Sequence, residues 1–185
     1  MDSIPVHALW LAQDDPKKNT AVLASKRGDL TLHKNVRSLP KRGVILEPLC
    51  GKVFGPEDHE LLTQRGGALV GLDCSWAHIE TSVESVMKRT RLQPRMLPLL
   101  LAANPVNWGK PGRLTTAEAL ATVLYLVGRR DQADDVLGAF RWGGRFFELN
   151  REPLDAYASA TSSQQVVDLQ FDFFDIDRPT EDDEP

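Results

Sequence analysis

The chain of 185 residues has few of the residues that define several classes of protein. Its only two cysteines, Cys50 and Cys74, are too few for a disulfide scaffold. The four histidines are scattered over residues 7–78 without metal-ligand spacing, so no metal is expected. The longest apolar run, residues 97–103, is too short to span a bilayer, and no membrane partner is expected. The first residues lack the pattern of a secretory signal, so we predict a cytoplasmic protein.

Acidic residues are concentrated at one end of the chain. The formal net charge is −4, whereas residues 168–185 alone hold eight acids and one arginine, a net charge of −7. The preceding 167 residues therefore carry +3 and form a mildly basic body, which is compatible with a nucleic-acid partner. We interpret the acidic end as a solvated tail.

Short apolar runs and helix signals alternate along the first part of the chain, which is typical of an α/β fold with a mostly parallel sheet. The predicted strands are residues 4–12, 43–49, 68–72 and 97–103. The predicted helices are residues 20–26 and 57–64 and a segment running from Ile79 to Met87.

From about residue 104 the pattern becomes helical. Thr115 and Glu118 have the spacing of a capping box, and an apolar stripe follows them. Further helices are expected at 133–140 and 153–160, with an aromatic loop at 141–147 between them. The predicted parts are an α/β domain at 1–95 with a further strand near 97–103, a helical domain at 104–167, and the acidic tail at 168–185.

Polar motifs follow three of the predicted strands, at residues 14–20, 72–76 and 103–111. Ligands of parallel sheets bind at the carboxyl ends of the strands, so a ligand cleft is expected there. None of the motifs is a nucleotide fingerprint such as G-x-G-x-x-G or a P-loop, so the residues alone do not name the ligand.

Several residues of these motifs have both a structural and a functional interpretation. Asp73 either caps the helix that follows it or serves the site. Trp76 either packs in the core or offers an aromatic face to a cationic or planar ligand. Thr20 either begins a helix or binds a carboxylate at the helix start. Basic residues are either scattered surface charge or an RNA-binding surface, and those we assign to RNA are Lys17, Lys18, Lys88, Arg89 and Arg91.

Taken together, the motifs resemble those of the small-subunit ribosomal RNA aminocarboxypropyltransferases of archaea and eukaryotes. The resemblance runs from about residue 5 to about residue 150, with all motifs in the same order. The matching segments are D-P-K-K at 15–18 with Thr20, L-D-C-S-W at 72–76, R-M-L-P-L-L-L-A-A-N-P-V-N-W-G-K-P at 95–111, L-T-T-A-E-A at 114–119, F-R-W-G at 140–143 and F-E-L-N at 147–150.

This resemblance implies a SPOUT-like α/β domain with a knotted chain path, followed by an all-helical domain, with S-adenosylmethionine bound between the two. It implies transfer of the 3-amino-3-carboxypropyl group of S-adenosylmethionine to N3 of a uridine or modified pseudouridine in small-subunit rRNA. The by-product would be 5′-methylthioadenosine, and a monomer is expected. The alternatives are a SPOUT RNA methyltransferase and a noncatalytic ribosome-assembly factor that binds RNA.

The resemblance also implies roles for individual residues. Asp73 would be the catalytic base near the nucleobase, and Thr20 would hold the carboxylate of the transferred group. The carbonyl of Leu72 would accept from the ribose hydroxyls, and backbone groups of Leu97 and Gly112 would contact the adenine edge. The residues implied to surround the adenine are Leu46, Pro48, Trp76, Leu97, Leu114 and Ala119. The chain departs from the family pattern at Asn19, where cysteine is common, and at Trp108, where tyrosine is frequent.

Overall fold

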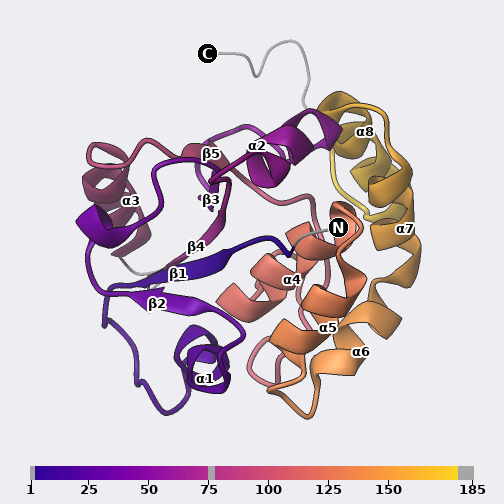
Figure 1. The fold of residues 1–185 in the computed structure, drawn as a ribbon. Coiled ribbons are helices and arrows are strands. Elements are labelled where there is room, and N and C mark those ends of the chain that lie inside the picture. Colours follow the sequence, from indigo (N-terminus) through magenta and orange to yellow (C-terminus); the bar gives the residue numbers. More distant parts are fainter. Residues whose placement is uncertain (1–2, 75–77, 179–185) are drawn as a thin grey trace.

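The structure of the protein is a computed structural model that describes residues 3–74 and 78–178. Within these residues the chain forms one five-stranded sheet and eight α-helices (Figure 1). The strands are β1 (Val6–Trp10), β2 (Thr31–His33), β3 (Val44–Leu46), β4 (Leu69–Asp73) and β5 (Gln93–Arg95). The helices are α1 (Thr20–Arg27), α2 (His59–Thr63), α3 (Ile79–Met87), α4 (Thr116–Leu126), α5 (Arg130–Leu137), α6 (Gly143–Leu149), α7 (Arg151–Ser159) and α8 (Ser163–Phe173). Among the residues described, none of these helices is both long and apolar enough to cross a membrane.

The sheet has the order β2-β1-β4-β3-β5, and all its strand pairs are parallel. The expectation of a SPOUT-like domain with a knotted chain path is therefore corrected: what the structure supports is an α/β fold with a five-stranded parallel sheet in this order. Alternation of strands and helices in the sequence predicts a parallel sheet, but it holds no information about how the chain is threaded through the fold.

Helices cover both faces of the sheet, and the strand residues alternate between the two. Along β4, Leu69 belongs to the large core cluster on the face of α4, whereas Val70 belongs to a smaller cluster with Val86 of α3 on the opposite face. This alternation follows from the two-residue period of a strand. It also places Gly71 and Asp73 on the face of α4, where they meet the start of that helix.

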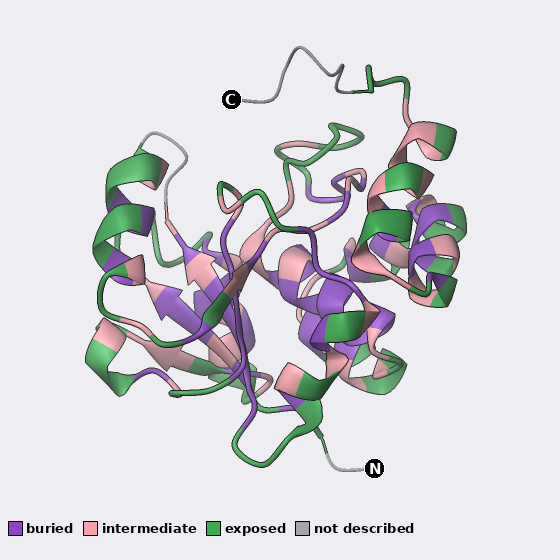
Figure 2. Ribbon diagram, turned by 90° about the horizontal axis from the view of Figure 1, so that it is seen from above, coloured by how far each residue is buried: buried purple, intermediate pink, exposed green. Residues whose placement is uncertain are grey.

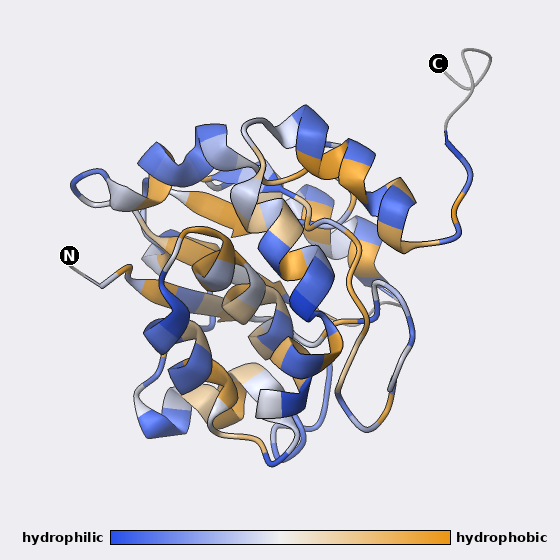
Figure 3. Ribbon diagram, turned by 90° about the vertical axis from the view of Figure 1, so that its right-hand side faces the viewer, coloured by the Kyte–Doolittle hydropathy of each residue, from blue (hydrophilic) through white to orange (hydrophobic). Residues whose placement is uncertain are grey.

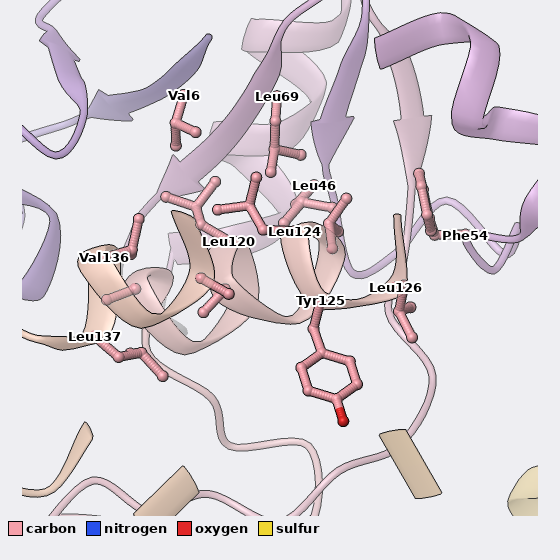
Figure 4. Packing of buried hydrophobic residues seen from close by; sticks show 14 of the residues in the cluster. Val6, Leu46, Phe54, Leu69, Leu120, Leu124, Tyr125, Leu126, Val136 and Leu137 are labelled. Atoms are coloured by element: carbon pink, nitrogen blue, oxygen red, sulfur yellow. The ribbon is translucent and has the colours of Figure 1, made fainter. Parts of the chain in front are cut away.

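Helix α4 is the centre of the fold and is buried on nearly all sides (Figure 2). One side of α4 packs on the sheet, where Leu120 and Leu124 lie towards Val6, Leu46 and Leu69 (Figure 4). Its other sides contact α5 and α7. The outer helices are amphipathic, with hydrophilic residues facing solvent, as the alternating colours of the helices in Figure 3 show. Helix α8 ends at Phe173, inside the stretch from residue 168 that we had grouped with the acidic tail.

Residues 97–103 do not form a strand of the sheet, contrary to the prediction from their apolar run. Their backbone groups bond to side chains of the helical half instead. Leu99 accepts from the Tyr157 hydroxyl (3.0 Å), Leu101 donates to and accepts from the side-chain amide of Asn150 (both 2.8 Å), and Ala103 donates to Glu118 (2.7 Å). Extended backbone needs hydrogen-bond partners, and here helix side chains on one side and the backbone of residues 109–112 on the other supply them in place of a strand of the sheet.

The aromatic segment at 141–147, predicted to be a loop, is largely helical because α6 begins at Gly143. The two glycines in this segment favoured a loop in the sequence. Gly143 has a packing role instead, since an added Cβ would lie 2.1 Å from the carbonyl oxygen of Leu137. A close approach of two helices therefore requires glycine there, independent of any turn.

The buried carboxylate of Glu118 connects three parts of the molecule. Glu118 is fully buried and accepts from the backbone amides of Ala103 (2.7 Å), Asn104 (3.1 Å) and Thr115 (2.7 Å). It also accepts from the Asn104 side-chain amide (2.9 Å) and the Thr115 hydroxyl (3.0 Å). The predicted capping box is thereby confirmed, and the same carboxylate attaches the motif after residue 103 to α4.

We predict that Glu118→Gln lowers the free energy of unfolding by about 3 kcal/mol. The glutamine side chain has no negative charge, and its NH2 group would face the N–H and O–H groups that donate to the carboxylate. Urea denaturation measures this difference. Glu80→Gln, which changes an exposed acid in the first turn of α3, is the control and should change stability by less than about 0.5 kcal/mol. Equal stability of the two variants would contradict the structural role of Glu118.

Candidate functional site

A cavity of about 330 Å³ lies at the carboxyl ends of β3, β4 and β5, beside the first turn of α4. Its volume is within the range of about 300–1,000 Å³ that is usual for small-molecule sites. The lining is mostly apolar, with a few polar groups. The lining residues are Leu46, Glu47, Pro48, Leu49, Gly71, Leu72, Cys74, Ile79, Arg95, Met96, Leu97, Pro98, Leu99, Gly112, Leu114, Thr115, Thr116 and Ala119.

The structure brings most of the residues assigned to S-adenosylmethionine to this cavity. They come from three separate parts of the chain: the ends of two strands, the extended segment after β5, and the start of α4. Those that line it are Leu46, Pro48, Leu72, Leu97, Gly112, Leu114 and Ala119. Trp76 lies outside the described residues. The backbone amide of Gly112 donates to the carbonyl of Leu100 (2.9 Å) and is therefore already bonded within the fold.

Asp73 and Thr20 lie at the edge of the cavity, joined to it through the first turn of α4. Thr116, which lines the cavity, donates its hydroxyl proton to a carboxylate oxygen of Asp73 (3.0 Å). The hydroxyl of Thr20 accepts from the backbone amide of Ala117 (3.3 Å). The amino termini of α1 and α4 therefore meet here, and helix amino termini favour a negatively charged group.

Gly71 allows the first turn of α4 to lie close to β4. An added Cβ would lie 2.8 Å from the side chain of Thr116 and 3.3 Å from that of Leu120, so a larger residue would push α4 away from β4. A glycine in the middle of a strand weakens the strand, and close approach of another element is one reason for its presence. Here the approaching element is the turn that holds Asp73.

Asp73 is buried and has a hydrogen bond to each of its carboxylate oxygens. The Asn19 side-chain amide donates to one oxygen, and Thr116 donates to the other. Burial raises the pKa of Asp73 above its ordinary value of 3.8, whereas the bonds from Asn19 and Thr116 oppose that rise. Asn19 also accepts from the amide of Val22 (3.0 Å) and so caps α1 while it contacts Asp73. The carboxyl group thus joins α1, β4 and α4.

Three polar residues of the lining, Glu47, Arg95 and Cys74, were given no role in the site from the sequence. Glu47 is buried and accepts from the backbone amide of Leu49. Arg95 is buried, and its guanidinium forms a two-point ion pair with Asp58 (2.7 and 2.9 Å), which removes it from any RNA-binding surface. Burial raises the pKa of Cys74 to about 11, so its thiol stays protonated near neutral pH and is a poor nucleophile. Glu47 carried no sequence signal beyond its place directly after a strand.

The basic residues assigned to RNA lie at two opposite edges of the sheet, one formed by the carboxyl ends of the strands and the other by their amino ends. Lys17 and Lys18 are exposed and directly precede α1, on the edge that holds Asp73. Helix α3 runs back from the carboxyl end of β4, so the residues at and after its end approach the start of β5 at the other edge. This second group, Lys88, Arg89 and Arg91, is therefore not brought to the cavity, and Lys88 forms an ion pair with Glu84 (2.6 Å).

Comparison with known proteins assigns the chain to a family. A family model described as "Ribosome biogenesis protein, C-terminal" matches residues 44–174. The 16S rRNA aminocarboxypropyltransferase of Methanothermobacter thermautotrophicus is 42% identical over 159 residues, which cover 86% of this chain and 92% of that protein. The enzyme of the same name from Methanopyrus kandleri is 43% identical over the same shares of both chains. The chain belongs to the 16S rRNA aminocarboxypropyltransferase family.

A solved structure supports both the fold and the family. The SAM-dependent rRNA:acp-transferase Tsr3 from Vulcanisaeta distributa superimposes with a TM-score of 0.78 at 34% identity, covering 92% of this chain and 95% of that one. The predicted family is thereby confirmed. These names favour aminocarboxypropyl transfer over the two alternatives, a methyltransferase and a noncatalytic assembly factor.

We predict that Asn19→Ala raises the pKa of Asp73 further, because it removes a donor that stabilises the carboxylate. Carbon-13 NMR titration of the carboxyl group measures this pKa. A raised pKa means that Asp73 favours folding at acid pH and that this contribution is lost as the pH rises through the pKa. Asn35→Ala is the control. It removes the asparagine that caps the short 3-10 helix at residues 36–38 and should leave the Asp73 titration unchanged. An identical shift in both variants would refute the role of Asn19.

Proposed function

We propose that this protein transfers the 3-amino-3-carboxypropyl group of S-adenosylmethionine to N3 of a uridine or modified pseudouridine in small-subunit rRNA, with release of 5′-methylthioadenosine. Membership of the aminocarboxypropyltransferase family over most of the chain is the observation that carries the proposal. The cavity supports it independently, since a mostly apolar space with a few polar groups suits an adenosine with a charged amino-acid arm.

The residues present fit the donor molecule in two regions. The apolar walls formed by Leu46, Pro48, Leu97, Leu114 and Ala119 would enclose the adenine, with the carbonyl of Gly112 at its edge. The carbonyl of Leu72, at the end of β4, would accept from the ribose hydroxyls.

The second region receives the amino-acid arm. Thr20 and the converging starts of α1 and α4 would hold its carboxylate, because helix amino termini favour anions. Glu47 adds a negative charge to the wall, which suits the positive charge of the donor. Trp76 stays a predicted adenine contact.

S-adenosylmethionine supplies an electrophilic carbon next to its sulfonium, and the methyl group is the easiest of its three such carbons to attack. The protein must therefore expose the carbon of the aminocarboxypropyl arm and bury the methyl group. Positioning by the cavity walls and by Thr20 achieves this selection without a protein nucleophile. The protonated state of the Cys74 thiol agrees with direct transfer to RNA.

Asp73 is the proposed base that accepts the N3 proton or orients the nucleobase. Its carboxylate is held by Asn19 and Thr116, and its pKa is raised by burial, which brings it closer to the range useful for proton transfer. N3 lies on the base-pairing edge, so the acceptor nucleotide must be unpaired. Lys17 and Lys18, on the same edge as Asp73, would contact its phosphates. We expect a monomer that acts in the cytoplasm.

Mass spectrometry of rRNA nucleosides tests the proposal directly. Purified protein is incubated with S-adenosylmethionine and small ribosomal subunits that lack the modification. A mass gain of one aminocarboxypropyl group, together with release of methylthioadenosine, is expected. A methyl gain with release of S-adenosylhomocysteine would contradict the proposed transfer.

We predict that Asp73→Asn lowers the transfer rate by about 100- to 10,000-fold, the usual contribution of a general base. Binding of S-adenosylmethionine, measured by calorimetry, should change by less than about 3-fold, because the donor contacts other residues. Asp131→Asn, an exposed substitution at the start of α5, is the control for both measurements. A fully active Asp73→Asn variant would exclude Asp73 as the base.

A further inference from the structure

Residues 104–113, here called the Trp108 loop, carry two of the most exposed large apolar side chains of the described residues. Val106 is 82% exposed and Trp108 is 54% exposed. Neither is in the core cluster, so the fold gains little from their apolar surface. A tryptophan held on the surface has a planar face available for contact with a partner.

The Trp108 loop is fixed by hydrogen bonds to its own backbone and to its base. Asn107 donates its amide to the side chain of Asn104 (3.0 Å), and Lys110 donates to the carbonyl of Asn107 (2.9 Å). Gly109 donates to Ala102 (2.7 Å), which donates in turn to Lys110 (3.1 Å). The loop is therefore pre-organised, which lowers the entropy lost when a partner binds.

The base of the loop lies against the same turn of α4 that holds the reaction centre. Glu118 bonds Asn104 at the start of the loop, while Thr116, two residues earlier, bonds Asp73. Gly112, near the end of the loop, lines the cavity. Gly112 is four positions after Trp108 in the chain, so their Cα atoms are at most about 14 Å apart. Trp108 is thus within reach of RNA whose target nucleotide lies at the cavity.

The charge of the loop favours RNA over a protein as the partner. The loop contains two basic residues, Lys110 and Arg113, and no acidic residue, although the chain as a whole is acidic. Both basic residues are exposed. Lys17 and Lys18 add positive charge beside α1, whose first residue, Thr20, contacts α4. An exposed aromatic ring beside cations is the usual platform for unpaired nucleotides, because bases stack on the ring and phosphates pair with the cations.

We infer that the Trp108 loop binds the substrate RNA, with Trp108 stacking on an unpaired base next to the modified nucleotide and Lys110 contacting the phosphate backbone. The inference rests on the proposed function, which makes RNA the acceptor. Stacking on Trp108 holds open the single-stranded region that presents the target base to Asp73. The side chains of Trp108 and Lys110 thereby serve RNA binding, whereas Gly112 near the end of the loop lines the donor cavity.

Binding of a fluorescent oligouridine of about 12 nucleotides, followed by anisotropy, tests the inference without requiring transfer. Trp108→Ala should weaken binding by about 5- to 100-fold, the range for loss of one stacked base. Trp108→Phe keeps an aromatic face and should restore binding to within about 3-fold of the unsubstituted protein. The same oligomer annealed to oligoadenosine should bind Trp108→Ala and the unsubstituted protein equally, because paired bases are not available for stacking.

Two matched controls separate stacking from general effects. Val106→Ala removes a more exposed apolar side chain from the same loop and should leave RNA binding unchanged. Lys110→Gln should weaken binding and lower its salt dependence, whereas Lys41→Gln, an exposed change before β3 at the opposite edge of the sheet, should do neither. All variants should keep the unfolding midpoint and the affinity for S-adenosylmethionine of the unsubstituted protein.

Equal RNA affinity of Trp108→Ala and the unsubstituted protein would overturn the inference, as would an unsubstituted protein that does not bind the oligouridine. Loss of self-association in Trp108→Ala with unchanged RNA affinity would identify the loop as a protein interface and would also overturn it. If RNA binding depends on Trp108 but no group is transferred to small subunits, the inference about the loop stands and the proposed function fails.

Discussion

The site depends on the hydrogen bonds that the buried carboxylate of Glu118 accepts. This carboxylate lies in the first turn of the central helix α4, and five donors from Ala103, Asn104 and Thr115 point at it. One buried charge therefore caps α4, ends the extended segment after β5 and anchors the Trp108 loop. A buried carboxylate is unfavourable unless its oxygens are fully bonded, so residues 103–104 and the start of α4, which supply the donors, must come together in one arrangement.

The cavity at the carboxyl ends of β3, β4 and β5 is a consequence of that arrangement. The extended segment 97–103 is bonded along its length to Tyr157, Asn150 and Glu118, and so its first residues are held opposite the ends of β3 and β4. Gly71 lets α4 approach β4 closely enough for Thr116 to reach Asp73. The cavity is thus bounded by strand ends on one side and by backbone held in place by helices on the other. Rigid walls of this kind suit a reaction whose selectivity depends on positioning.

Local sequence signals predicted the elements whose pattern is local. The capping box at Thr115 and Glu118 and the alternation of strands and helices were confirmed. The segment 97–103 was assigned wrongly because an apolar extended run has the same pattern whether its backbone bonds to a strand or to helix side chains. Strand β2 was not predicted, since three residues of mixed polarity give no detectable period. Asp73 and Thr20 lie at a strand end and a helix start, as predicted, whereas the sequence did not assign Glu47 to the cavity lining.

By itself, the sequence determined the family, the strand–helix pattern and the order of the motifs along the chain, because these depend on residues that are close together in the sequence. The tertiary structure decided which motifs meet. It joined Asn19, Asp73 and Thr116 from three distant segments, separated Lys88 from the cavity, and buried Arg95 against Asp58. It also replaced the expected knotted SPOUT-like domain with a five-stranded parallel sheet of defined order. Strand order, helix contacts and the pairing of buried charges arise from long-range packing, for which a single sequence has no local signal.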